Sequence, residues 1–101
     1  MSTYAVLREA VLAKKQVVCW YQGYERSICP HVLGTKRGRE QTLAFQFAGG
    51  SKTGLPPGGR WRCMVVAEIA NATLRDGDWH TGDDHSRPQT CVDVIDVEVS
   101  F

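Results

Sequence analysis

The strongest constraint on the fold is the two-residue alternation of residues 41–48. Large apolar side chains fall on one side of an extended chain and smaller or polar ones on the other: Leu43, Phe45 and Phe47 against Thr42, Ala44 and Gln46. Successive side chains of a strand point to opposite faces of a sheet, so this period predicts a half-buried strand. The rest of the chain must supply strands that pair with it and apolar surface that covers it.

Further segments have the composition of strands, being rich in β-branched and aromatic residues between turn-forming residues: 16–22, 26–33, 60–67 and 91–99. Residues 23–25 form a short connection, which predicts a hairpin between the first two of these strands. Pro30 cannot donate a backbone N–H to a neighbouring strand. We therefore expect the strand 26–33 to lie at a sheet edge and to be bulged or bent at Pro30.

A helix is expected before the first strand, over residues 3–15, with Ser2 or Thr3 as its N-cap. Its apolar face consists of residues that recur at helical spacing: Val6, Leu7, Ala10 and Val11. Residues 68–74 are expected to form a helical turn. The glycine- and proline-rich residues 49–59 and the polar residues 75–90 are expected to be mobile loops.

These elements indicate one domain over residues 1–101, and a composition of 43% hydrophobic and 23% charged residues excludes wholesale disorder. Short strands with bent members usually curl, because closure removes exposed strand edges. We therefore expect a mainly β fold with one N-terminal helix. Its five strands, within residues 16–99, would form a small Sm-like (Src-homology-3-like) barrel that the helix caps at one end.

Charge and hydropathy exclude several protein classes. The formal net charge of +1 creates no global field that would attract nucleic acid or lipid, so a polyanion site must be local. No apolar run approaches the roughly 20 residues of a membrane span, and the N-terminus lacks the features of a signal peptide. We expect a cytoplasmic protein without membrane contact. Its cysteines would be reduced thiols that act as small apolar fillers: Cys19, Cys29, Cys63 and Cys91.

The order of the segments carries a family resemblance. The residues concerned are Leu7-Arg8-Glu9-Ala10-Val11, Val17-Val18-Cys19-Trp20-Tyr21, Arg26-Ser27-Ile28-Cys29-Pro30-His31-Val32-Leu33-Gly34, Thr42-Leu43-Ala44-Phe45 and Trp61-Arg62-Cys63-Met64-Val65-Val66-Ala67-Glu68-Ile69. From the helix to about Leu74, the chain resembles the WYL domain of bacterial regulators. In that family these segments are a helix, a strand ending in Tyr, a strand with Arg and Pro, the strand of the Trp-Tyr-Leu tripeptide and an Arg-containing strand.

The resemblance implies a small Sm-like barrel that senses a ligand in transcription regulation. It also implies binding of nucleotides or single-stranded nucleic acid through basic and aromatic side chains, with Arg26 and Arg62 at family positions. The chain departs from the family at Gln41-Thr42-Leu43, in place of the tripeptide, and at Glu68, where many members have arginine. Many members also carry a helix-turn-helix DNA reader. The 101 residues hold no such segment, so we expect a stand-alone, divergent member.

The candidate ligand-binding residues are basic and aromatic: Arg26, Arg60, Arg62, Trp20, Tyr21, Arg37 and Arg39, with Lys36 and Trp61 as further members. Guanidinium groups pair bidentately with phosphate, and aromatic faces stack on bases. Arg60 and Arg62 share a strand face and could clamp one phosphate together. In the alternative interpretation, Trp20 and Trp61 fill the core and the arginines are solvated charges on strand edges.

Two other clusters contain residue types that bind metals or catalyse reactions. The late loop holds carboxylates and imidazoles that suit zinc or manganese, but without the spacing of a metal motif: Asp78, His80, Asp83, Asp84 and His85. Cys29 and His31 share a strand face, although a nucleophile pair also needs a third, orienting group. We therefore expect no metal, no cofactor and no catalytic residue, and hence a protein that is not an enzyme.

The leading hypothesis is a non-catalytic regulatory or ligand-sensing module that works with a protein partner or as a homodimer. The alternative is a protein-interaction or structural module that acts through an exposed strand edge. A metal-dependent enzyme built on the loop of His80 and His85 is the third hypothesis.

Overall fold

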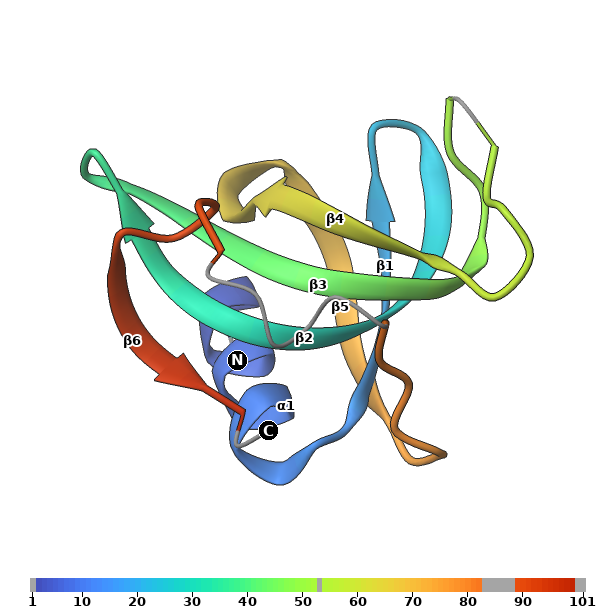
Figure 1. Cartoon of the computed structure of the whole chain (residues 1–101), viewed down its shortest axis with the longest axis horizontal. Helices are drawn as coiled ribbons and strands as arrows, with labels where there is room; N and C mark the ends of the chain where they lie inside the picture. The colour runs from blue at the N-terminus through green and yellow to red at the C-terminus, as the bar shows by residue number, and fades with distance from the viewer. Residues whose placement is uncertain (1, 53, 83–88, 100–101) are drawn as a thin grey trace.

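One helix packs on a strongly bent antiparallel sheet in the computed structural model, which describes residues 2–52, 54–82 and 89–99 (Figure 1). The elements in chain order are α1 (Thr3–Ala13), β1 (Gln16–Tyr21), β2 (Tyr24–Lys36), β3 (Arg39–Gly49), β4 (Arg60–Val65), the 3-10 turn η1 (Val66–Glu68), β5 (Ile69–Arg75) and β6 (Val94–Glu98). The expected mainly β fold with one N-terminal helix is confirmed. The sheet has six strands where five were expected.

The two edges of the sheet are brought together by the chain itself. The strand order is β4-β3-β2-β1-β5, and β6 pairs with β2 outside this path. β4 and β5 thus lie at opposite ends of the order, yet the three residues of η1 connect them. The sheet must curve until its edges approach each other, as Figure 1 shows. In the described part of the chain β4 and β5 do not pair, so the sheet is open and a closed Sm-like barrel is not confirmed.

β2 is the central strand, so the edge position predicted from Pro30 is wrong. One side of β2 pairs with β3, and its other side pairs first with β1, as far as Ile28, and then with β6, from Val32. Pro30 lies between these two partners, where β2 passes from one to the other. The predicted bulge is confirmed, because the register with β3 shifts between Pro30 and Val32.

Residues 66–75 also differ from the prediction. The strand expected over 60–67 ends at Val65, and the helical turn expected over 68–74 is η1 followed by β5. Alanine and asparagine have low β propensity, so local sequence gave no indication of β5. Pairing with β1, from Gln16 opposite Arg75 to Tyr21 opposite Ile69, imposes the extended conformation on this segment.

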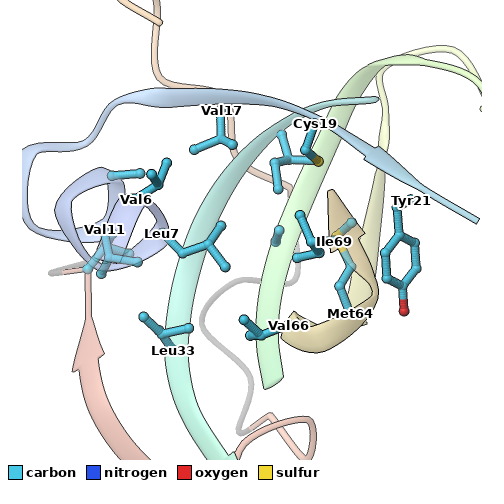
Figure 2. Packing of buried hydrophobic residues seen from close by; sticks show 14 residues of the cluster. Val6, Leu7, Val11, Val17, Cys19, Tyr21, Leu33, Met64, Val66 and Ile69 are labelled. Atoms are coloured by element: carbon cyan, nitrogen blue, oxygen red, sulfur yellow. The ribbon is translucent and has the colours of Figure 1, made fainter. Parts of the chain in front are cut away.

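The core lies between α1 and the inner face of the curved sheet (Figure 2). The buried residues of α1 are the predicted ones, Val6, Leu7, Ala10 and Val11, and Ser2 Oγ accepts a hydrogen bond from Ala5 N at 3.1 Å as the N-cap. The strands contribute the opposing side chains: Val17, Cys19, Ile28, Leu33, Ala44, Met64 and Ile69. The helix therefore covers one side of the sheet's inner face, as the sequence predicts.

A disulfide joins Cys63 of β4 to Cys91, with Cα atoms 5.6 Å apart. The expectation of reduced thiols is wrong for this pair, whereas Cys19 and Cys29 are free and buried, as expected of small fillers. The reason is tertiary. The segment before β6 lies beside β3, where Gln41 Nε2 donates to the Cys91 carbonyl at 2.7 Å, and this brings Cys91 to β4. The separation of 28 residues along the chain contains no hint of this approach.

Removal of the disulfide should destabilise the fold. We expect the Cys63→Ser, Cys91→Ser double variant to unfold with a free energy lower by about 3–4 kcal/mol, the chain-entropy value for a loop of this length. Urea titration followed by circular dichroism measures the difference. A reductant should lower the urea midpoint of the wild-type chain and leave that of the double variant unchanged. The prediction would be contradicted by a wild-type midpoint that is the same with and without the reductant.

Candidate anion-binding site

Side chains of β2, β3 and β4 meet on the inner face of the sheet. Ile28 of β2 pairs with Gln46 of β3, which in turn pairs with Arg60 of β4. Side chains two residues apart on a strand share a face, so Arg26 and Arg62 point to the same face as Gln46. The neighbouring Tyr21 lies at the end of the core away from the α1 residues Val6 and Val11 (Figure 2). The site therefore continues the core at the end that α1 does not cover.

The guanidinium groups of Arg26 and Arg62 converge on one oxygen atom. Arg26 Nη1 donates to Gln46 Oε1 at 3.3 Å, and Arg62 Nε donates to the same oxygen at 3.2 Å. Gln46 Nε2 donates to the carbonyls of Ala48 and Gly50, at 3.1 and 3.0 Å. These two bonds orient the amide, because its NH₂ group faces carbonyls and its oxygen faces the two arginines.

Each arginine makes further hydrogen bonds. Arg26 Nε donates to the backbone carbonyl of Tyr21 at 3.2 Å. Arg62 Nη2 donates to Ser51 Oγ at 2.8 Å and to the Gly54 carbonyl at 3.3 Å. The glycine-rich loop between β3 and β4 thus folds back onto Arg62, and both guanidinium groups have defined positions.

Neither arginine pairs with a carboxylate within residues 2–52, 54–82 and 89–99, where the ion pairs are Arg8–Asp96 and Lys15–Asp76. Arg26 is nevertheless only 2% exposed. Burial, followed by the charges of Arg26 and Arg60, lowers the pKa of Arg62. Buried arginines are normally paired with an acid, so this site holds positive charge that no carboxylate of the described residues compensates.

Two tyrosines lie against Arg26. Its Cζ atom is 5.1 Å from the ring centroid of Tyr21 and 6.0 Å from that of Tyr24, within the range of cation–π attraction. Tyr21 is buried, and its hydroxyl accepts a hydrogen bond from Val65 N at 3.1 Å. Tyr24 is 39% exposed, so it is the aromatic side chain that the site presents to solvent.

The structure brings together only some of the predicted residues. Arg26, Arg62 and Tyr21 meet as described, and Arg60 lies exposed beside them on β4. Trp20 is next to Tyr21 on β1 but projects to the opposite face of the strand and is 44% exposed.

Arg37 and Arg39 lie far from this site. The ladder of β2 and β3 runs from Arg26 opposite Gly49 to Lys36 opposite Arg39, so the basic turn is at its other end. Arg39 Nη2 donates to Gln41 Oε1 at 2.8 Å. The basic residues 36–39 therefore form a separate surface.

Sequence reasoning missed Tyr24, Gln46 and Ser51. The predicted connection over 23–25 placed Tyr24 in a loop, whereas the turn is Gln22–Gly23, with φ of 51° and 84°, and Tyr24 begins β2. Two residues with positive φ are typical of the tight hairpin turns that fit the twist of a sheet. Gln46 lies on the side of β3 with Thr42 and Ala44, which the alternation marks as the smaller and more polar side, although the structure buries it fully, so the sequence contained no signal for this site.

The other face of β4 carries Trp61, within an aromatic cluster around His31. The His31 ring is fully buried, with its centroid 4.7 Å from that of Trp61 and 4.8 Å from that of Trp79. Its Nδ1 lies 2.7 Å from the Cys29 carbonyl, to which it donates, and its Nε2 is hydrogen-bonded to Thr81 Oγ1 at 3.0 Å. Residues 79–81 therefore cover this face of the sheet, and Trp61 takes no part in the arginine site.

Cys29 and His31 do not form a thiol–imidazole pair, because the imidazole contacts the Cys29 backbone carbonyl. The Cys29 Sγ atom instead accepts a hydrogen bond from His80 N at 3.4 Å. Burial raises the pKa of the Cys29 thiol, which keeps it protonated and weakens it as a nucleophile. The structure gives this pair no catalytic geometry.

The metal site considered for the late loop falls partly outside the described residues, since Asp83, Asp84 and His85 are among those not described. The His80 ring stacks on Phe47 with a centroid distance of 4.0 Å. Within residues 2–52, 54–82 and 89–99, no group of three or more metal-binding side chains is placed to hold an ion. No helix in the same residues is long and apolar enough to cross a membrane.

The chain matches no family model, no curated protein and no solved structure. The resemblance to the WYL domain therefore stays a prediction.

Loss of the shared acceptor should destabilise the site. We expect Gln46→Met to lower the free energy of unfolding by about 1–3 kcal/mol, because the buried Arg26 and two backbone carbonyls lose hydrogen-bond partners. Urea unfolding measures the change. The matched control is Gln22→Met in the exposed β1–β2 turn, which should unfold like the wild type; equal stabilities for the two variants would contradict the structural role of Gln46.

Proposed function

We propose that the protein is a non-catalytic regulatory module that senses a phosphate-bearing ligand, a nucleotide or a short single-stranded nucleic acid, at the arginine site. The observation that carries this proposal is the convergence of Arg26 and Arg62 on Gln46 Oε1 without a carboxylate beside them in the described residues. Such a site lacks one component, a negative charge, which the ligand would bring.

The arginines would have different parts in binding. Arg26 is almost fully buried and is fixed by hydrogen bonds from Nε and Nη1, so it would act as a fixed charge beneath the ligand. Arg62 is half-buried and Arg60 is exposed, so these two would hydrogen-bond to phosphate oxygens. At an effective dielectric constant of about 20, each cation at about 4 Å attracts a unit negative charge by about 4 kcal/mol before desolvation is counted. Two or three cations together are therefore sufficient for specific binding.

The chemistry of the site favours binding over catalysis. A guanidinium keeps its proton at neutral pH, so it cannot exchange protons with a substrate as a general acid or base does. The groups that hydrogen-bond to Arg62 are an amide, a hydroxyl and a carbonyl, none of which titrates near neutrality. We therefore include the absence of catalytic activity in the proposal.

Membership in the WYL family, with a divergent Sm-like barrel, belongs to the same proposal. The support is that the sheet curls until a three-residue turn connects its edges, and that Arg26 and Arg62, the two residues at family positions, are the ones that meet on Gln46. A role in transcription regulation follows from the family alone.

The expected cytoplasmic location is also part of the proposal. In that compartment, glutathione and thioredoxin keep most cysteines as thiols, so the Cys63–Cys91 disulfide of the structure favours an oxidising compartment, and the state of this pair tests the location. Alkylation of free thiols in intact cells measures which state occurs. Failure of the reagent to modify either Cys63 or Cys91 would contradict a cytoplasmic location.

A protein-interaction function has a separate observation in its favour. Val94 and Ile95 of β6 are 68% and 43% exposed, and β6 pairs with β2 along one side. The other side of β6 could pair with a strand of a second copy. Light scattering after size exclusion tests this alternative: it is supported by a dimer that Val94→Lys dissociates and excluded by a wild-type monomer at high concentration.

Substitution of Arg62 should weaken ligand binding. We expect Arg62→Gln to reduce the affinity for adenosine triphosphate and for a fluorescent ten-residue oligothymidylate by at least tenfold, about 1.4 kcal/mol. Wild-type affinity should also fall steeply with salt. Calorimetry and fluorescence anisotropy measure both effects.

The matched control is Arg39→Gln, which removes the same charge at the far end of the β2–β3 ladder and should leave binding nearly unchanged. Equal losses in the two variants would indicate non-specific electrostatics. No binding of either probe by the wild-type chain would reject the proposal.

A further inference from the structure

A cavity of about 480 Å³ opens beside Arg60, on the face of the sheet opposite Gln46. Its lining comes from β3, β4, the end of the glycine-rich loop and the segment that covers the sheet: Phe45, Pro57, Gly58, Gly59, Arg60, Trp61, Thr81 and Gly82. The rings of Phe45 and Trp61 pack edge to face, with centroids 5.3 Å apart. The cavity therefore has aromatic walls and borders β4 at Arg60, whose side chain lies with that of Arg62 on the other face of the strand.

Glycines keep this cavity open. Gly59 has φ of +95°, and a Cβ atom there would lie 2.7 Å from the Phe45 ring. Gly82 lies directly against Nε1 of the Trp61 indole. A side chain at Gly59 or Gly82 would occupy the space next to the aromatic rings. Glycine at these two positions therefore leaves room for the cavity.

The indole of Trp61 has an unused hydrogen-bond donor. Its Nε1 atom is buried and has no hydrogen-bond partner. Among the described residues, no other buried side-chain nitrogen or oxygen lacks one. Buried indole N–H groups usually find an acceptor, and leaving one unpaired is unfavourable. Because Gly82 lies directly against this buried atom, a ligand acceptor would reach Nε1 only by displacing Gly82.

Arg60 connects the cavity to the arginine site. It lines the cavity and lies two residues before Arg62 on the same strand. β4 is at the end of the strand order, so one of its long edges is free of a strand partner in the described sheet. A ligand could therefore pass around this edge, with one part in the cavity and a charged part at Arg60 and Arg62.

We infer that the cavity takes the base of a mononucleotide, whose phosphates lie at Arg60 and Arg62. This inference rests on the proposed function and selects a nucleotide over a nucleic-acid strand. Small-molecule sites usually have volumes of roughly 300–1,000 Å³, so this cavity is one of the smaller ones and has room for one base. Trp61 is partly exposed, so contact of the base with its ring would stabilise the complex, whereas Phe45 is buried and only lines the wall.

The test separates the base from the phosphates. Calorimetry with the full chain compares adenosine triphosphate, guanosine triphosphate and cytidine triphosphate with inorganic tripolyphosphate, which has three phosphates but neither base nor ribose, and with ribose 5-triphosphate, which lacks only the base and should bind like tripolyphosphate. We expect at least one nucleotide to bind tenfold or more tightly than tripolyphosphate. Trp61→Phe, which removes the indole N–H, should weaken that nucleotide at least fivefold and leave tripolyphosphate unchanged. Trp20→Phe is the matched control and should change neither.

A spectroscopic measurement keeps the inference testable should Trp61→Phe fail to fold. In the wild-type chain with ¹⁵N-labelled tryptophan, the indole resonance of Trp61, assigned with Trp20→Phe and Trp79→Phe, should shift on addition of the nucleotide and not of tripolyphosphate.

The possible failures are distinguishable. Equal binding of nucleotides and tripolyphosphate, an unshifted Trp61 resonance, or tighter binding of a ten-residue oligothymidylate than of any nucleotide would overturn the inference and leave the proposed function intact. Absence of binding by all of these probes would reject both.

Discussion

The arrangement of this protein depends on the pairing of β2 with three other strands. β2 pairs with β3 on one side, and on the other it passes from β1 to β6 near Pro30. A strand that changes partner must bend, and the bulge between Pro30 and Val32 supplies the bend. The bend curves the sheet around the apolar face of α1. It also separates two polar regions of β2, Arg26 near one end and Lys36 at the other.

This curvature explains how charged residues come to be buried in so small a protein. The inner face is apolar along Val17, Ile28 and Met64, next to which the same strands continue with Arg26, Gln46 and Arg62. A buried arginine without an acid is unfavourable, because desolvation disfavours its charged form. The hydrogen bonds that the arginines donate to Gln46 Oε1 and to backbone carbonyls compensate only partly, since an amide dipole is weaker than a carboxylate. The lowered pKa of Arg62 reflects the remaining cost. A site that would be relieved by a bound anion is the physical basis for the proposed ligand.

β4 is the strand on which the proposed functions meet. It carries Arg62 toward the inner face and Trp61 toward the outer one, which follows from the alternation of side chains along a strand. As an edge strand, it needs other means of support than pairing on both sides. β3 pairs with it, η1 ties its end to β5, and the disulfide ties Cys63 to the segment before β6. These constraints would hold the arginines and the aromatic cavity in fixed relation to each other.

Local sequence patterns were sufficient to predict several elements of this structure. Period-3.6 spacing and the Ser2 cap were sufficient for α1 and its buried face, and period-2 alternation was sufficient for β3, because both signals come from residues close together in sequence. Alternation also placed Arg60 and Arg62 on one face of β4, and the family resemblance selected Arg26 and Arg62 from among the basic residues.

Only the tertiary structure decided the rest. β5 has no local strand signal and is extended because β1 pairs with it. The central position of β2 depends on which strands approach it, and the Cys63–Cys91 bond on where the segment before β6 lies. The selection of Gln46, Ser51 and Tyr24 as neighbours of the arginines, and the exclusion of Arg37 and Arg39, likewise depend on register between strands. Register and long-range approach result from the packing of the whole chain around one core, and no stretch of neighbouring residues contains that information.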